Sequence, residues 1–249
     1  MTRVLWPAVF GVALLVGMWI TERRSQDRSV ARKTYLFGVW GGFLGARAWF
    51  SAQYGLSSAG MSFWGFVMGA TLAVVLYRRF HFGHWQMWDF PDAVAPALLL
   101  GDAVVRIGCF LHGCCYGKVC DLPWAVTFGP SDPAYHTQLG QGLIDRFAAS
   151  SLPVHPTQLY EALFAAGLAL LLINRGSRLP RHFSFLLAMA LYAVFRFFLE
   201  FVRGDSGGAH VGSLTFAQAT ALGMLLASLG LMWWKMPVRT VAKAGGEAG

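Results

Sequence analysis

Residues 102–118, DAVVRIGCFLHGCCYGK, combine an apolar run, a charge inside that run, and a cluster of cysteine and glycine at its end. Arg106 lies within the apolar part, and a charge at the centre of a membrane helix costs at least about 2.5 kcal/mol. The segment after His112 is not expected to continue as a lipid-facing helix, because irregular backbone at membrane depth requires protein or water partners. A costly charge beside a broken helix predicts a buried polar site.

The composition of the whole chain indicates an all-α membrane protein. Of its 249 residues, 56% are hydrophobic and 13% are charged, against a typical charged share of about 25%. We therefore expect residues 1–249 to form a single polytopic membrane domain. The net charge of +8 does not indicate binding to nucleic acid, because the basic residues occur in short clusters between apolar runs, as in multispanning proteins.

Seven stretches of the chain approach the roughly 20 mostly apolar residues that a spanning helix needs. The first is expected to be retained, because Glu22, Arg23 and Arg24 follow it where a signal peptide would carry small residues for cleavage. The predicted spans are residues 4–20, 35–54, 62–77, 92–111, 157–174, 183–202 and 214–234.

The distribution of basic residues predicts the orientation of the spans. Thirteen of the 20 Lys and Arg residues lie in loops 21–34, 78–86 and 175–182 and in the tail after residue 234, and four lie in the opposite loops. Cytoplasmic loops carry the excess of Lys and Arg. We expect a multi-pass protein of the bacterial inner membrane, with its N-terminus in the periplasm and its C-terminus in the cytoplasm.

Two segments on the predicted outer side are longer than simple turns. Residues 112–156, between the fourth and fifth spans, are expected to form a small periplasmic cap, and the spacing of residues 139–149 predicts an amphipathic helix within it. Residues 203–213, RGDSGGAHVGS, form a glycine-rich turn that we interpret as a gate.

The sixth predicted span carries a stripe of polar side chains. Tyr192, Arg196, Glu200 and Arg203 follow one another at i, i+4, i+8 and i+11, which places them on one face of a helix. Arginine suits a phosphate in an apolar site, because its planar fork donates two parallel hydrogen bonds. The stripe therefore favours binding of a phosphate group.

The intramembrane arginines also have a simpler interpretation. Arg196 would pair with Glu200, and Asp102 would pair with Arg47 or Arg106, so that each pair neutralises a buried charge. Arg47 lies near the outer end of its span, where a long side chain reaches the membrane surface. For Arg47 this second interpretation is favoured.

A polar motif, HPTQLYE at residues 155–161, opens the fifth span. One interpretation is that His155 and Glu161 line the outer mouth of a cavity. The other is that Thr157, or the turn before it, caps the helix and that Glu161 only complements the positive helix N-terminus.

The four cysteines, Cys109, Cys114, Cys115 and Cys120, lie at or beyond the outer end of the fourth span, an oxidising location in bacteria. A disulfide from Cys120 to Cys114 or Cys115 is one interpretation, and a thiolate nucleophile is another. With His112 a metal site is a third, but the spacing lacks the paired C-x2-C of structural zinc. We expect neither a metal nor any other cofactor.

Five pieces of the sequence together resemble the prolipoprotein diacylglyceryl transferase family of bacterial inner-membrane enzymes. They run in the family order between residues 41 and 205. The pieces are GGFLGARAWF (41–50), GMSFWG (60–65), RIGCFLHGCCYG (106–117), HPTQLYE (155–161) and YAVFRFFLEFVRGD (192–205).

The resemblance implies seven transmembrane helices around a central cavity open to the outer leaflet, with a periplasmic cap. It implies transfer of diacylglycerol from phosphatidylglycerol to the lipobox cysteine thiol in a prolipoprotein signal peptide, with release of glycerol-1-phosphate. Arg106 and Arg196 take the positions of the family's two essential arginines. The substrate-binding positions that match are Gly108, Gly117, Tyr192, His155, Gln158, Tyr160, Glu161, Glu200 and Arg203.

The sequence departs from the family pattern at several positions. Trp64 occupies the place of the histidine in the family's S-F-H-G, Cys109 replaces the signature asparagine, and residues 112–114 replace N-G-E. A tyrosine expected near the start of the first helix is Pro7. These departures concern the base and part of the pocket for the lipid head.

The predicted function is therefore a diacylglyceryl transferase whose partners are phosphatidylglycerol, a prolipoprotein and membrane lipids. A histidine is basic enough to deprotonate a thiol, and His112 is preferred over His155 because it lies six residues from Arg106. Two alternatives remain open: a transferase of the same lipid group with another acceptor, and a non-catalytic protein that binds or transports lipid.

Overall fold

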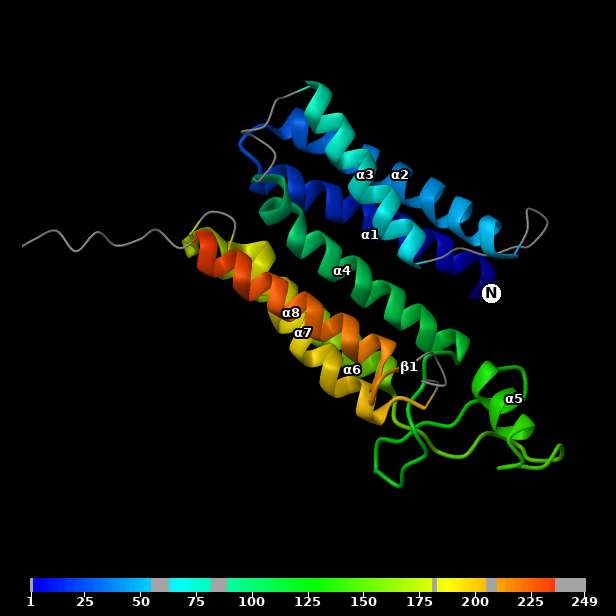
Figure 1. Ribbon diagram of the computed structural model, residues 1–249. Coiled ribbons are helices and arrows are strands. Elements are labelled where there is room, and N and C mark those ends of the chain that lie inside the picture. Colours follow the sequence, from blue (N-terminus) through cyan, green and yellow to red (C-terminus); the bar gives the residue numbers. More distant parts are fainter. Residues whose placement is uncertain (1, 55–62, 82–88, 181–182, 205–209, 236–249) are drawn as a thin grey trace, which may run out of the picture.

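The computed structural model of this chain describes residues 2–54, 63–81, 89–180, 183–204 and 210–235 and is predominantly helical (Figure 1). The long helices coincide with the predicted spans and differ from them by a few residues at their ends. In chain order the elements are α1 (Thr2–Arg24), α2 (Arg28–Tyr54), α3 (Phe63–His81), α4 (Asp89–His112), α5 (Pro133–Gly140), α6 (Thr157–Arg175), η1 (Gly176–Arg178), α7 (Phe183–Leu199), η2 (Glu200–Val202), β1 (His210–Val211), β2 (Leu214–Thr215) and α8 (Phe216–Lys235).

The chain is a multi-pass membrane protein. Within the part that the structure describes, four helices are long and apolar enough to cross a membrane: Phe90–His112, Thr157–Arg175, Phe183–Val202 and Phe216–Trp234. Large apolar side chains cover the outside of the bundle, and Leu163 on α6 and Trp233 on α8 are 74% and 81% exposed. Such apolar surface is unfavourable in water and fits a lipid surrounding.

Helix α4 lies in the middle of the bundle, with α1, α2 and α3 on one side and α6, α7 and α8 on the other (Figure 1). Its contact with α6 consists largely of small residues, among them Ala95, Ala103, Ala162 and Ala165. Small residues let helix backbones approach closely, which is how helices associate where lipid removes the hydrophobic driving force. The packing therefore fixes Arg106 on α4 close to the polar residues at the start of α6.

Helices α2 and α3 approach each other through glycines spaced four residues apart. A Cβ atom on Gly45 would lie 2.3 Å from the carbonyl oxygen of Gly65, and one on Gly69 would lie 2.3 Å from the carbonyl oxygen of Gly41. This backbone contact is the close packing that a small-xxx-small pattern allows between membrane helices. It explains the glycines of the GGFLG segment by packing rather than by chemistry.

The basic clusters collect at one end of the bundle. The C-terminal ends of α1, α3, α6 and α8 lie at this end, whereas α5 and the C-terminal end of α4 lie at the other (Figure 1). The ion pair between Arg32 and Glu22, with Nε 2.6 Å from Oε1, joins the first two helices there. Among the described residues, the basic clusters are thus separated from the opposite end of the bundle, as the sequence predicted. The side of the membrane that each end faces stays a prediction.

Residues 113–156 carry a small core of their own between α4 and α6. Tyr116, Phe128, Ala134 and Val154 are buried together. The helix predicted at residues 139–149 is wrong, because α5 ends at Gly140 and the chain then turns at Gly142, whose φ is +71°. The glycine-rich segment 203–213 is described only in part, since residues 205–209 lie outside the described residues.

Candidate functional site

The chain reverses direction immediately after α4. Gly113 and Cys115 both adopt positive φ, at +71° and +61°, and this conformation is uncommon for a residue with a Cβ. The amide of Cys114 donates to the carbonyl oxygen of Cys109 at 3.1 Å, which closes the turn. The break in the helix that the sequence indicated is therefore a tight reversal of the backbone at His112–Cys115.

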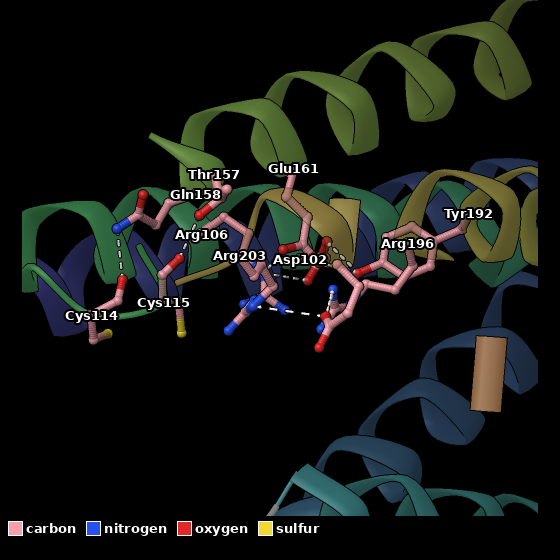
Figure 2. Close-up of polar contacts among 11 residues, drawn as sticks. Asp102, Arg106, Cys114, Cys115, Thr157, Gln158, Glu161, Tyr192, Arg196 and Arg203 are labelled. Carbon is pink, nitrogen blue, oxygen red and sulfur yellow. Dashed lines mark hydrogen bonds and ion pairs between the residues drawn. The ribbon is translucent and has the colours of Figure 1, made fainter. Parts of the chain in front are cut away.

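Two buried side chains at the start of α6 hold this reversal. Thr157 Oγ1 donates to the carbonyl oxygen of Cys115, and Gln158 Nε2 donates to that of Cys114, both at 2.7 Å (Figure 2). Of the two caps considered for α6, Thr157 and the turn before it, Thr157 is wrong, because the N-cap residue is Pro156 in that turn and no side chain makes a cap hydrogen bond. The Thr157 hydroxyl satisfies the carbonyl of the reversed loop instead.

Gly117 lies where three segments meet. Its amide donates to the carbonyl oxygen of His155 at 2.9 Å, and it forms an isolated bridge with Arg203. A Cβ on Gly117 would lie 2.4 Å from His155 Cβ and 2.8 Å from the carbonyl oxygen of Val202. This position therefore requires glycine for close approach of the backbones. Gly108 lies within α4, one turn before the reversal.

Arg106 is held between two carboxylates. Its Nε lies 3.1 Å from Glu161 Oε2 on α6 and 3.4 Å from Asp102 Oδ1 one turn earlier on α4 (Figure 2). The Glu161 side chain is 1% exposed and the Arg106 side chain is 19% exposed. Nε makes no hydrogen bond with either oxygen, so these contacts are ion pairs without hydrogen-bond alignment. The pairing of Arg106 with Asp102 was anticipated, whereas its shorter contact with Glu161 was not.

Tyr192 connects this ion-pair group to α7. Its hydroxyl donates to Glu161 Oε1 at 2.6 Å and lies 3.3 Å from Asp102 Oδ2. The hydroxyl thus bridges the two carboxylates that hold Arg106. Helices α4, α6 and α7 each contribute to the group, and its geometry depends on the packing of all three.

The stripe predicted on the sixth span is largely present. Arg196 Nη1 lies 2.7 Å from Glu200 Oε2, and Arg203 Nε lies 4.0 Å from the same oxygen (Figure 2). The α-helix ends at Leu199 and continues as the 3₁₀ turn η2, after which Arg203 is extended. The change of helix type shifts the end of the stripe, yet Glu200 remains buried between the two arginines.

Of the two predicted histidine bases, one is held by neighbouring side chains. His155 Nδ1 lies 3.4 Å from the Tyr160 hydroxyl, which accepts a 2.7 Å hydrogen bond from Trp124 Nε1. His112 is the exposed last residue of α4, and within the described residues it makes no contact with Arg106. No specific sequence signal pointed to Trp124, which lies 36 residues from Tyr160.

Three of the four cysteines converge. The Sγ atoms of Cys109, Cys114 and Cys115 all lie within 4.8 Å of one another. The four cysteines are free thiols, and Cys120 is not a member of this group. Hydrogen bonds from the neighbouring thiols lower the pKa of Cys115, and Arg203 and Arg106 lower it further. The structure therefore groups Cys109 with the adjacent pair, whereas the sequence interpretation paired Cys120 with one of them.

Two departures from the family pattern, Trp64 and Pro7, have side chains outside the described residues. Arg47 lies on α2 with an exposed side chain, and its place near the membrane surface stays a prediction. Asp102 was considered only as a charge partner, although its spacing of four residues from Arg106 already placed both on one face of α4.

Comparison with known proteins identifies the family of the chain. A family model described as prolipoprotein diacylglyceryl transferase matches residues 4–234. The phosphatidylglycerol–prolipoprotein diacylglyceryl transferase of Pseudomonas putida is 33% identical over 221 residues, which cover 86% of this chain and 69% of that protein. The protein of the same name from Clostridium tetani is 30% identical over 234 residues, covering 86% of each chain. The chain therefore belongs to the prolipoprotein diacylglyceryl transferase family.

Proposed function

We propose that this protein transfers the diacylglyceryl group of phosphatidylglycerol to a cysteine thiol of a prolipoprotein. Its relatives are named phosphatidylglycerol–prolipoprotein diacylglyceryl transferases. The observation that carries the proposal is the anchoring of Arg106 between α4, α6 and α7. A bundle that needed only packing would not bury carboxylates and arginines together, because desolvating an ion costs several kcal/mol even when it is paired. This desolvation cost indicates that the arginines serve a function beyond packing.

The function of the arginines is recognition of the lipid phosphate. The shortest contact of Arg106 to each carboxylate is made by Nε. A guanidinium carries five N–H donors, more than these two contacts use, and arginine binds a phosphate through two parallel hydrogen bonds. Arg196 and Arg203 supply further positive charge around Glu200.

The reaction follows from this placement. The acceptor sulfur attacks the glyceryl carbon, the C–O bond to the phosphate breaks, and the electron pair leaves with the phosphate oxygen of glycerol-1-phosphate. Fixed guanidinium groups stabilise charge that develops on this oxygen, and such fixed charges are most effective where water is excluded. His112 and His155 are the proposed acceptors of the thiol proton.

The remaining site assignments extend this proposal. Residues around the reversed loop and the two arginine groups would line the pocket for the lipid head. They are Gly108, Cys109, Gly117, Gln158, Tyr160, Glu161, Tyr192, Glu200 and Arg203.

We also propose that α1, α2 and α3 join the four apolar helices as spans, which gives seven around a central cavity. Residues 112–156 would then form a periplasmic cap, because they lie at the end opposite the basic clusters. The protein would lie in the bacterial inner membrane, with its N-terminus outside and its C-terminus in the cytoplasm.

The test is transfer by purified protein from labelled phosphatidylglycerol to a lipobox peptide. Wild-type protein should lipidate the peptide, and Arg106→Ala should reduce the rate by at least about 100-fold, as for removal of a charge-stabilising group. Lipidation that persists at the wild-type rate in Arg106→Ala would contradict the assignment. If His112→Ala and His155→Ala each keep full activity, the assignment of a histidine base is wrong.

A second candidate keeps the lipid site and changes the acceptor. It is favoured by Cys109 and Cys114, which stand where the family carries an asparagine and N-G-E. Rescue of cells depleted of their own diacylglyceryl transferase would support the prolipoprotein acceptor. Release of glycerol-1-phosphate without lipidation of the peptide would support another acceptor.

A further inference from the structure

The group of Cys109, Cys114 and Cys115 has the form of a metal site. Three Sγ atoms lie within 4.8 Å of one another, and sulfurs bound to one tetrahedral Zn²⁺ at about 2.3 Å lie about 3.8 Å apart. Closing the group onto an ion therefore requires movements of about 1 Å or less. A disulfide would join only two of the three sulfurs, and it would not explain why the third converges on the pair.

Both carbonyl groups of the adjacent pair are fixed by buried donors. Thr157 and Gln158 hold the carbonyl oxygens of Cys115 and Cys114 at 2.7 Å each, and Cys115 is kept at a φ of +61°. Residues held in sparsely populated backbone conformations cluster at functional sites, where the surrounding structure compensates their cost. The hydrogen bonds therefore hold the backbone from which the two thiols project.

The type of ligand in the group selects the ion that it can hold. Soft thiolate ligands select thiophilic cations such as Zn²⁺ and Cu⁺ over Mg²⁺ or Ca²⁺. Among the described residues, no His, Asp or Glu joins the three cysteines in the group, so a bound ion would keep one position for an external ligand.

We propose that Cys109, Cys114 and Cys115 bind one thiophilic cation, Zn²⁺ being the probe of choice, and that its open position takes the acceptor thiol. The second half rests on the proposed function. A thiol bound to Zn²⁺ loses its proton readily, and here the proton passes to the histidine proposed above, His112 or His155. The sulfur electron pair then forms the S–C bond as the C–O bond breaks and its pair leaves with the phosphate oxygen. The metal thereby activates the thiol whose proton the histidine accepts.

The binding test uses the full-length protein, reduced, freed of metal with a chelator, and titrated with Cd²⁺ as a spectroscopic substitute for Zn²⁺. Wild-type protein should bind one equivalent with a sulfur-to-metal absorption band, and Cys120→Ser should behave identically. Cys109→Ser and Cys114→Ser should weaken binding by more than about 100-fold, since even partners outside the ligand set contribute about 10–100-fold. Zn²⁺ should also raise the unfolding temperature of wild-type protein and of Cys120→Ser, and of neither ligand variant.

Three results would overturn the metal site. One is wild-type protein with four titratable thiols and no absorption band on addition of Cd²⁺. Another is loss of binding in Cys120→Ser equal to that in Cys114→Ser. The third is a disulfide within Cys109, Cys114 and Cys115, mapped by mass spectrometry in protein isolated from membranes without reductant. The unfolding temperatures without metal show whether a variant lost binding because it failed to fold.

The transfer assay separates the metal site from the proposed function. Chelation should abolish peptide lipidation and Zn²⁺ should restore it, while binding of phosphatidylglycerol remains. Full transfer after chelation would overturn the role in thiol activation and leave the transferase function intact. A protein that binds one Cd²⁺ through the three cysteines yet never lipidates the peptide would contradict the transferase function and leave the metal site intact.

Discussion

The arrangement around Arg106 predicts that its two carboxylate partners are not equivalent. Glu161 is 1% exposed, lies 3.1 Å from Arg106 Nε, and accepts a 2.6 Å hydrogen bond from Tyr192. Asp102 is 24% exposed and lies 3.4 Å from the same nitrogen. Glu161→Gln should therefore be the more damaging change, and Asp102→Asn is its matched control.

The size of the effect follows from what each change removes. Glu161→Gln removes the charge of the carboxylate that pairs with Arg106 and accepts the Tyr192 hydrogen bond. A hydrogen bond to a charged group contributes about 1.5–3 kcal/mol, so a misplaced Arg106 in this variant should lower the transfer rate by about 10- to 150-fold. Unpairing a fully buried charge costs about 3–5 kcal/mol of stability. Because Asp102 still pairs with Arg106 in this variant, we expect the loss of stability to fall at or below the lower end of that range. Asp102→Asn should cost about 1 kcal/mol or less, since water screens a partly exposed pair.

The measurement is the rate of peptide lipidation from phosphatidylglycerol, together with chemical unfolding in the same detergent. Tyr192→Phe should approach Glu161→Gln in its effect on the rate, and the double variant should lose little more, because the two side chains act through one guanidinium. If Asp102→Asn reduces the rate as much as Glu161→Gln, or if the losses of Tyr192→Phe and Glu161→Gln add fully, the role of Glu161 as the main anchor is refuted.

Other predictions concern packing and surface charge. Gly117→Ala should abolish folding or activity, because its Cβ would lie 2.4 Å from His155 Cβ. Gly101→Ala is the control: a Cβ there meets nothing within 4 Å, so the change should be neutral or stabilise α4 by up to about 1 kcal/mol. Thermal unfolding of both variants distinguishes these outcomes. Gly45→Ala should separate α2 from α3 and lower the unfolding temperature, since its Cβ would lie 2.3 Å from a backbone oxygen. Arg32 lowers the pKa of Glu22, chiefly through a hydrogen bond, so the pair should stabilise the protein above the ordinary pKa of 4.5 and cease to do so as the pH falls through the lowered value. In an NMR titration, Arg32→Ala should return the pKa of Glu22 toward its ordinary value.

The helices and the location of the polar site could be predicted from the sequence because both depend on local properties. Hydropathy over about 20 residues identifies a membrane helix, and each predicted span falls on a helix. Arg106 was identifiable because a charge in such a run is rare. The contact of Arg196 with Glu200 followed from helical spacing alone.

The two failures have different origins. Residues 139–149 have helical spacing, but they contain Gly140 and Gly142, and the chain turns at Gly142 with a positive φ that glycine adopts without steric cost. Thr157 is a plausible cap by its position, but it donates to the carbonyl oxygen of Cys115, 42 residues away. In the second case a contact distant in the sequence overrode a local capping preference that is worth about 1 kcal/mol.

The segment of residues 102–118 shows where the two kinds of information divide. Its sequence alone determined that a membrane helix carries a charge and then breaks, because hydropathy and glycine content act within the segment. Only the tertiary structure decided that Glu161 is the closest partner of Arg106, and that Cys109 rather than Cys120 joins Cys114 and Cys115. The physical reason is that these contacts form only when α4, α6 and α7 pack together. Residue spacing within one helix does not predict which residues of another helix will lie against it.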